Sequence, residues 1–199
     1  RDAAFTWLKN GTLGSSHGHA DQTHLSMYYK GKPFLIDSGR YTYLEGDPLR
    51  VLLKKPCAHN VCVIDGQSGG EPDGSWSYHR YDETLKNYFA EAENAHYAEM
   101  AFHGTLLNGT PYLIKRKILV LDDGIWLSTQ DAVCQGTHQV KEYCHLDSNV
   151  CVEPGKEHYL IHNEDVSLSI TPSENLQFRF GVISKRYNEK QYAPILVKV

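Results

Sequence analysis

The chain has 199 residues, of which 41% are hydrophobic and 22% are charged, and its formal net charge is −4 at neutral pH. A chain of this length and composition can bury one sizeable core and needs no second domain. The near-neutral balance, without a basic arm or a cationic helix face, argues against general binding to nucleic acid or to a membrane surface. No apolar run approaches the roughly 18 residues of a membrane span.

Basic side chains gather in one part of the chain. Between residues 30 and 55 there are six Lys or Arg and three Asp or Glu, a local excess of three positive charges. An excess of this kind points to an anionic ligand, although a scattered and solvated surface would give the same count. The composition therefore leaves the nature of the partner open.

Short apolar and aromatic runs alternate with turn signals along the chain. Strands are expected at residues 24–30, 33–37, 61–64, 78–92, 96–103, 112–121, 125–132, 158–163, 166–171, 176–183 and 192–199. Tight turns are expected at Gly31-Lys32, at Glu93-Asn94-Ala95 and at Asp122-Asp123-Gly124. Only residues 47–55 suggest a short helix or a structured loop.

The spacing of these signals indicates the fold class. Turn signals recur about every 8–12 residues and no helical period is sustained, which is typical of an all-β sandwich or barrel. We predict an all-β fold, an antiparallel two-layer β-sandwich, with residues 1–199 forming a single domain.

Two histidines and a carboxylate lie close together in the segment His17-Gly18-His19-Ala20-Asp21, and His59 follows downstream. Neutral imidazole and carboxylate oxygen are ligands that zinc accepts, and histidine also transfers protons near neutral pH. These residues suggest a divalent metal site or a proton-transfer site. Buried histidines that only make hydrogen bonds would show the same pattern.

The spacing of these residues does not choose a ligand set. The strands of the first hairpin place Asp37 opposite Leu25, so a simple register makes His24 the neighbour of Asp37. For His19 to reach Asp37, residues 19–22 must curl, because six extended residues span about 20 Å. Both arrangements stay open at this level.

Several motifs follow one another along the first third of the chain. They are His17-Gly-His-Ala-Asp-Gln22, Gly31-Lys-Pro-Phe-Leu-Ile-Asp-Ser-Gly39, Tyr41-Thr-Tyr43, Arg50, Ala58-His59-Asn60-Val61 and Asp65-Gly66. In order and approximate spacing this set resembles the C-terminal β-domain of the heparinase II/III-like polysaccharide lyases. The resemblance continues more weakly to His145 and covers most of the chain. A lone His-x-His is a weak signal, whereas the linked set is specific.

The resemblance implies an enzyme that cleaves uronic-acid polysaccharides by β-elimination. In that chemistry a side chain neutralises the C5 carboxylate, a base removes the C5 proton, and an acid protonates the departing O4. The resemblance also implies a structural zinc ion held by His19, Asp37 and His59. His17 would then face the substrate as a catalytic or carboxylate-neutralising group, and Asp21 would be a supporting residue or a cap.

The lyases of this family also carry an N-terminal helical toroid, which supplies a Tyr and an Asn or His to the active site. No such segment occurs in this chain, which opens at Arg1, so we expect a fragment that is inactive alone. The implied partners are the helical domain of the same enzyme and an anionic uronate polysaccharide or oligosaccharide, and the implied location is periplasmic or secreted. His24 stands where the family usually has a small or apolar residue, so the ligand assignment stays open there.

Aromatic and basic residues that follow the first hairpin are candidates for substrate binding. Tyr41 and Tyr43 lie at alternating positions that could line a cleft, and Arg40 and Arg50 could bind a carboxylate or sulfate through two parallel hydrogen bonds. Packing in a sheet or exposure at the surface is the alternative for each. Trp76 is expected in the core rather than as a platform for a sugar ring.

Two other classes of protein share some of these features. A cupin-like metal enzyme would also show His-x-His on a β-scaffold, but such sites usually have a Glu a few residues after the pair, where this chain has Gln22 and Thr23. A non-catalytic carbohydrate-binding or interface module with a structural metal is the third possibility. Metal analysis and an assay for unsaturated uronate products would separate the three classes.

Overall fold

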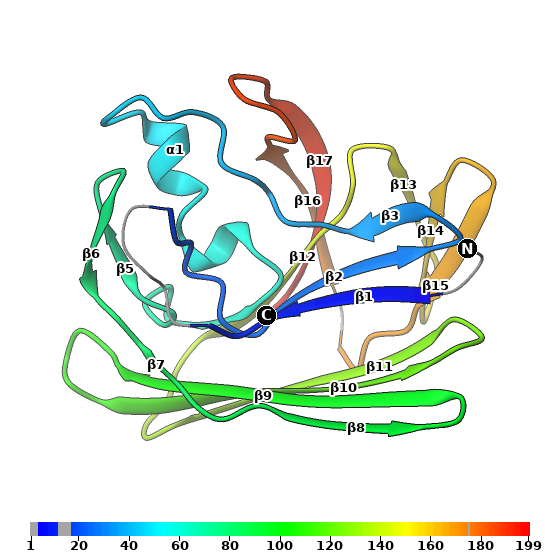
Figure 1. Cartoon of the computed structure of the whole chain (residues 1–199), viewed down its shortest axis with the longest axis horizontal. Helices are drawn as coiled ribbons and strands as arrows, with labels where there is room; N and C mark the ends of the chain where they lie inside the picture. The colour runs from blue at the N-terminus through cyan, green and yellow to red at the C-terminus, as the bar shows by residue number, and fades with distance from the viewer. Residues whose placement is uncertain (1–3, 12–16, 175) are drawn as a thin grey trace.

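A computed structural model describes residues 4–11, 17–174 and 176–199 (Figure 1). Its strands are β1 (Ala4–Lys9), β2 (His24–Tyr29), β3 (Lys32–Leu35), β4 (Cys62–Ile64), β5 (Glu71–Asp73), β6 (Ser77–Arg80), β7 (Glu83–Thr84), β8 (Tyr88–Ala92), β9 (Ala95–Thr105), β10 (Pro111–Leu121), β11 (Ile125–Cys134), β12 (Val140–His145), β13 (Val150–Pro154), β14 (Tyr159–Asn163), β15 (Val166–Ile170), β16 (Leu176–Ile183) and β17 (Gln191–Lys198). The strands pair antiparallel throughout the described residues. The prediction of an all-β, antiparallel fold is confirmed.

The strands of the described residues form five sheets, two of which have three strands each. The first sheet has the order β1-β2-β3, and the long sheet has the order β11-β10-β9-β7, with β8 also paired to β9. A third sheet has the order β16-β17-β12-β4, while β13-β14-β15 and β5-β6 are small. In Figure 1 the long sheet runs beneath the first sheet, so the fold has two layers at this point.

The main core lies between these two layers. Along β10 every second residue is buried, as the two-residue period of a strand requires when one face is covered. Ile118 on β10 and Ala98 on β9 belong to one buried cluster with Leu25 on β2 and Phe34 on β3. The predicted sandwich thus describes how the first sheet and the long sheet pack.

Helical structure is confined to the connection between β3 and β4. Helix α1 (Pro48–Leu52) begins after Asp47, whose Oδ1 accepts a hydrogen bond from the amide of Arg50 at 2.9 Å, and a 3-10 turn, η1 (Pro56–Ala58), follows. This agrees with the short helix expected at residues 47–55. Among the described residues, none of the helices has the length and apolar character needed to cross a membrane.

The strand predictions need two corrections. The single strand expected at residues 78–92 is wrong, because this segment forms three strands: β6, which pairs with β5, and then β7 and β8, which both pair with β9. Strands β1, β5, β12 and β13 were not predicted. Each of these lacks a long apolar run, since only one side of each strand packs inward and the burial pattern is mixed.

Candidate functional site

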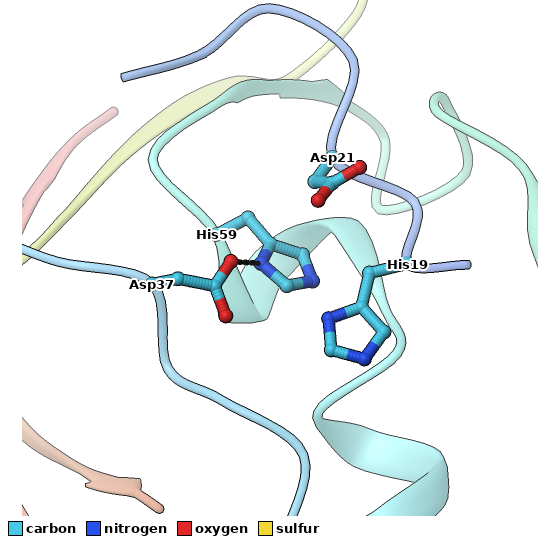
Figure 2. Close-up of side chains that lie close together, drawn as sticks. All are labelled: His19, Asp21, Asp37 and His59. Atoms are coloured by element: carbon cyan, nitrogen blue, oxygen red, sulfur yellow. Dashed lines mark hydrogen bonds and ion pairs between the residues drawn. The ribbon is translucent and has the colours of Figure 1, made fainter. Parts of the chain in front are cut away.

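Four potential metal ligands converge where the loop before β2 meets the ends of β3 and η1. His19 and Asp21 lie in that loop, Asp37 follows β3, and His59 follows η1. One ligand atom of each lies within 4.8 Å of the others (Figure 2). The structure therefore brings together the three residues that the family resemblance implies, and it places Asp21 beside them.

A tight turn before β2 makes this convergence possible. The amide of His24 donates to the carbonyl of Asp21 at 3.0 Å, and Thr23 adopts a left-handed conformation with φ of 64°. The chain reverses here instead of running extended into β2. His19 consequently lies near Asp37, as the curled alternative for residues 19–22 requires.

His59 and Asp37 form a buried pair. His59 Nδ1 donates to Asp37 Oδ2 at 2.9 Å, and the other oxygen of Asp37 accepts from the amide of Gly39 at 2.7 Å. Burial alone would raise the pKa of Asp37, but the charge and the hydrogen bond of His59 outweigh it and lower this pKa. Burial opposes protonation of His59, yet the charge of Asp37 raises the pKa of His59.

The second nitrogen of His59 has no partner in the part of the chain that the structure describes. His59 is fully buried, and its Nε2 makes no hydrogen bond there. Figure 2 shows this nitrogen turned toward His19. A buried imidazole nitrogen without a partner is costly unless something binds it, so this atom fits the role of a metal ligand.

His19 is held in its neutral form. Burial, reinforced by the charge of His59, lowers the pKa of His19 to about 3. Its ring lies 5.1 Å from the ring of His59, measured between centroids. A neutral imidazole offers the lone pair that metal binding requires.

Asp21 completes the cluster with a carboxylate that already has a partner. Its two oxygens lie 2.6 and 2.7 Å from the ammonium of Lys9 on β1, and Asp21 is 4% exposed. Burial raises the pKa of Asp21, and Lys9 counteracts this. Two imidazoles and two carboxylates form a donor set that zinc accepts, so the residues present fit such an ion.

Asn60 ties together the strands that carry this cluster. Its side-chain nitrogen, Nδ2, donates to the backbone carbonyls of Leu25 at 2.7 Å and Ile36 at 3.0 Å. Its side-chain oxygen, Oδ1, accepts from the backbone amide of His145 at 2.5 Å. The backbone carbonyl of Asn60 accepts from the buried guanidinium of Arg116 at 3.0 Å. The residue next to His59 is therefore fixed from several sides, which fixes the direction of the His59 side chain.

The same geometry assigns His24 a structural role. His24 Nδ1 accepts from the backbone amide of Asn60 at 3.2 Å, and its Nε2 lies 2.9 Å from the hydroxyl of Ser26. Burial lowers the pKa of His24 to about 3. Because both ring nitrogens are engaged, His24 does not offer a lone pair to the metal cluster, although simple register made it the neighbour of Asp37.

His17 lies apart from the cluster, on an exposed face with aromatic and basic side chains. Its ring centroid is 5.7 Å from that of Tyr43 and 6.0 Å from that of Trp76. Arg40 contacts His17 Nδ1 through Nη1, and its guanidinium lies 4.2 Å from the Tyr43 ring centroid and 5.2 Å from that of Trp76. Three residues that the sequence suggested for substrate contact, His17, Arg40 and Tyr43, thus share one surface. After that prediction we call this surface, together with Trp76, the substrate face.

The sequence did not reveal the place of Trp76. It was expected in the core, yet it is half-buried and stacks on Tyr43 with ring centroids 6.1 Å apart. The β5–β6 turn brings it there, and this turn rests on two buried cations. Arg50 donates to the carbonyl of Ser75 at 3.0 Å, and Lys54 donates to the carbonyl of Ser77 at 3.0 Å.

Arg50 and Tyr41 take different positions from the other predicted substrate contacts. Arg50 is 0% exposed and its guanidinium lies 5.7 Å from the ring centroid of Trp76, so the prediction of direct substrate contact by Arg50 is corrected to a supporting position beneath the face. Tyr41 is half-buried and lines a neighbouring pocket with Arg40 and Tyr43.

Fold and site together define an all-β domain with a histidine and aspartate cluster that could hold a metal ion. The family model described as "Heparinase II/III-like, C-terminal" matches residues 2–196. The chain therefore belongs to the heparinase II/III-like C-terminal family. No curated protein matches the chain.

Solved structures of lyases share this fold. Heparan sulfate lyase HepC from Pedobacter heparinus is 19% identical with a TM-score of 0.74, and the match covers 98% of this chain and 30% of that one. The heparinase III BT4657 gene product is 16% identical with a TM-score of 0.77, again over 98% of this chain and 30% of that one. The chain thus spans less than a third of the length of these two enzymes.

Proposed function

We propose that the chain is the β-domain of a polysaccharide lyase that cleaves uronic-acid glycans by β-elimination. The observation that carries the proposal is the position of His17, exposed beside Arg40 and two aromatic rings and two residues from the buried cluster. The names of the similar structures, heparan sulfate lyase and heparinase III, support glycosaminoglycan as the substrate class.

The substrate face has the groups that a uronate needs. Arg40 Nη1 donates to His17 Nδ1, so the neutral imidazole of His17 carries its proton on Nε2 and can donate it to a bound carboxylate. The guanidinium of Arg40 adds a positive charge beside that position, which favours the negative charge that develops when the C5 proton leaves. Tyr43 and Trp76 offer faces on which a sugar ring can pack.

We further propose that His19, Asp37 and His59 hold a zinc ion, with Asp21 supporting the site through its pair with Lys9. The ion would supply a structural cross-link between the loop before β2 and the ends of β3 and η1. In this proposal residues 1–199 form one domain, and a helical domain of the same enzyme completes the active site. A periplasmic or secreted location belongs to the same proposal.

One observation favours a second function. The stacked pair of the exposed Tyr43 and the half-buried Trp76, backed by Arg40, would also serve a non-catalytic module that binds an anionic carbohydrate. Such a module would bind uronate oligosaccharides and leave them intact. Because the chain belongs to the heparinase II/III-like C-terminal family, the cupin-like alternative is not proposed.

The test uses the complete protein that contains the chain. Metal content is measured, and unsaturated uronate products are followed by absorbance with alginate, heparan sulfate and hyaluronan as substrates. His17→Ala should abolish product formation, whereas His158→Ala, at an exposed position in another part of the chain, should leave it unchanged. Binding without product formation in the unmodified protein would favour the non-catalytic module, and iron-dependent redox turnover would overturn the lyase assignment.

A further inference from the structure

A second recognition surface lies next to the substrate face. A pocket opens between the segment that follows β3 and the loop that joins β16 to β17. Arg40, Tyr41 and Tyr43 line one side, and Lys185, Arg186 and Tyr187 line the other. No acidic side chain is among the described residues that line it. The residues on the first side were predicted from the sequence to contact substrate, whereas those on the second side were not.

The loop is fixed on the segment that carries Arg40. The amide of Ser184 donates to the carbonyl of Ser38 at 2.8 Å, and the amide of Asn188 donates to the carbonyl of Tyr41 at 2.7 Å. Gly39 has φ of 80°, and a Cβ atom there would lie 2.0 Å from the carbonyl oxygen of Ser184. A side chain at this position would push the loop away, so the close approach depends on glycine.

The charges in the pocket are only partly compensated. Lys185 is paired with the buried carboxylate of Asp147 at 2.6 Å. Arg186 makes no ion pair within the described ranges of the chain. Arg40 uses Nη1 on His17, while its Nε and Nη2 are buried and have no hydrogen-bond partner in the same ranges. In these ranges Arg186 therefore has no ion pair, and Arg40 has two unpartnered N–H groups beside the pocket that a bound anion would satisfy.

Aromatic rings connect the pocket with His17. The ring centroid of Tyr187 lies 5.6 Å from that of Tyr43, which in turn stacks on Trp76. We propose that this pocket binds the carboxylate or sulfate group of the sugar unit next to the one that faces His17, with Arg186 and Arg40 as donors and Tyr187 packing on the sugar. The inference rests on the proposed function and extends it to the β16–β17 loop.

The test measures binding to the complete protein by calorimetry. The probes are a heparan sulfate tetrasaccharide, its fully desulfated form and its carboxyl-reduced form. Arg186→Ala should weaken binding of the unmodified tetrasaccharide about tenfold, as expected for the loss of one charge-assisted hydrogen bond. Lys190→Ala is the matched control, because Lys190 is an exposed cation at the end of the same loop and does not line the pocket.

The probes also identify the group that is bound. If Arg186→Ala still binds the desulfated form more weakly than the unmodified protein does, the pocket binds a carboxylate. If this difference in affinity persists only with the carboxyl-reduced form, the pocket binds a sulfate. Equal affinities of Arg186→Ala and Lys190→Ala for every probe, or no binding of any probe, would overturn the inference. Product formation is assayed separately, so a protein that binds through Arg186 without cleaving would refute the lyase proposal alone.

Discussion

His17 and His19 are two residues apart and belong to two different regions. In the buried cluster, His19 joins Asp21 from its own loop and two donors from elsewhere in the chain, Asp37 and His59. Hydrogen bonds or charges from within the fold orient these side chains. On the substrate face, His17 contacts Arg40 and two aromatic rings and is open to solvent. The first region has a nearly complete set of partners, and the second has partners on one side.

The difference between the two regions separates what the chain can do alone from what it needs a partner to do. A site enclosed by three segments of the same domain can bind an ion without a further partner, because its ligands are already oriented. Within the residues that the structure describes, a face with partners on one side has room for a ligand but no second wall that would exclude water. Metal binding should therefore be a property of the chain, whereas turnover should require the complete enzyme.

The largest expected effect comes from Asn60, which orients the buried region. Asn60→Ala would leave two carbonyls and one amide buried without partners, at about 1–3 kcal/mol each, so we expect a loss of roughly 4 kcal/mol in the free energy of unfolding. Denaturant unfolding measures it. Asn149→Ala, at an exposed position, is the control. A loss no larger than in the control would mean that the buried region is not held by Asn60.

Removal of a ligand should have the next largest effect. His19→Ala should abolish stoichiometric zinc and lower the free energy of unfolding by about 3 kcal/mol, the stabilisation expected from an ion present at about 100 times its Kd. A chelator should lower the Tm of the unmodified protein and leave that of His19→Ala unchanged. If the chelator lowers both equally, or neither, the cluster does not hold the stabilising ion.

A smaller effect is expected on the substrate face. Arg40→Ala should reduce kcat/KM of the complete enzyme about 30-fold, which corresponds to about 2 kcal/mol of transition-state stabilisation. Its zinc content should stay at the unmodified level, because Arg40 belongs to the exposed region. Arg179→Ala, which removes an exposed guanidinium from β16, serves as the control. Loss of zinc in Arg40→Ala would show that the two regions are not separate.

The smallest effect concerns a histidine outside both regions. His138 lies 2.6 Å from Asp65 through Nδ1, and its Nε2 lies 2.8 Å from the carbonyl of Gln135. Both ring nitrogens face acceptor oxygens, so both must donate. These hydrogen bonds to Asp65 and Gln135 raise the pKa of His138. The hydrogen bond from His138 in turn lowers the pKa of Asp65. This histidine is favoured in its charged form, in contrast to His19.

The pair predicts a defined pH dependence. The contribution of His138 is fully present below its unfolded pKa of 6.5 and is lost as the pH rises through its higher folded pKa. The contribution of Asp65 is present above its unfolded pKa of 3.8 and is lost as the pH falls. The Tm difference between the unmodified protein and His138→Gln should be largest between these two values and shrink on either side. A difference that does not change with pH would contradict the assignment.

Much of the fold could be predicted from local patterns, and the ligand set only from resemblance. Period-two burial and turn residues indicated β10, β11 and the hairpin of β2 and β3. The proximity of His19 and Asp37 depends on the left-handed Thr23 and on the departure of the chain from β3, and neither follows from residue spacing. The linked motifs contained that information because they come from proteins with the same fold.

Other parts of the site were missed for a physical reason. The ring of Trp76 meets His17 and Tyr43 through the β5–β6 turn, which is held by buried cations that are distant in sequence. The β16–β17 loop reaches Tyr41 through backbone hydrogen bonds, which leave no signal in residue type. Long-range contacts of these kinds are set by topology rather than by local pattern.

If His17 and His19 serve separate regions, zinc binding and turnover should be separable in one variant. The complete enzyme carrying His17→Ala is purified, and its zinc content and its turnover of a uronate glycan are determined on the same sample. The account predicts one zinc ion per chain, as in the unmodified protein, and no detectable turnover. Loss of zinc together with turnover, or retention of both, would contradict it.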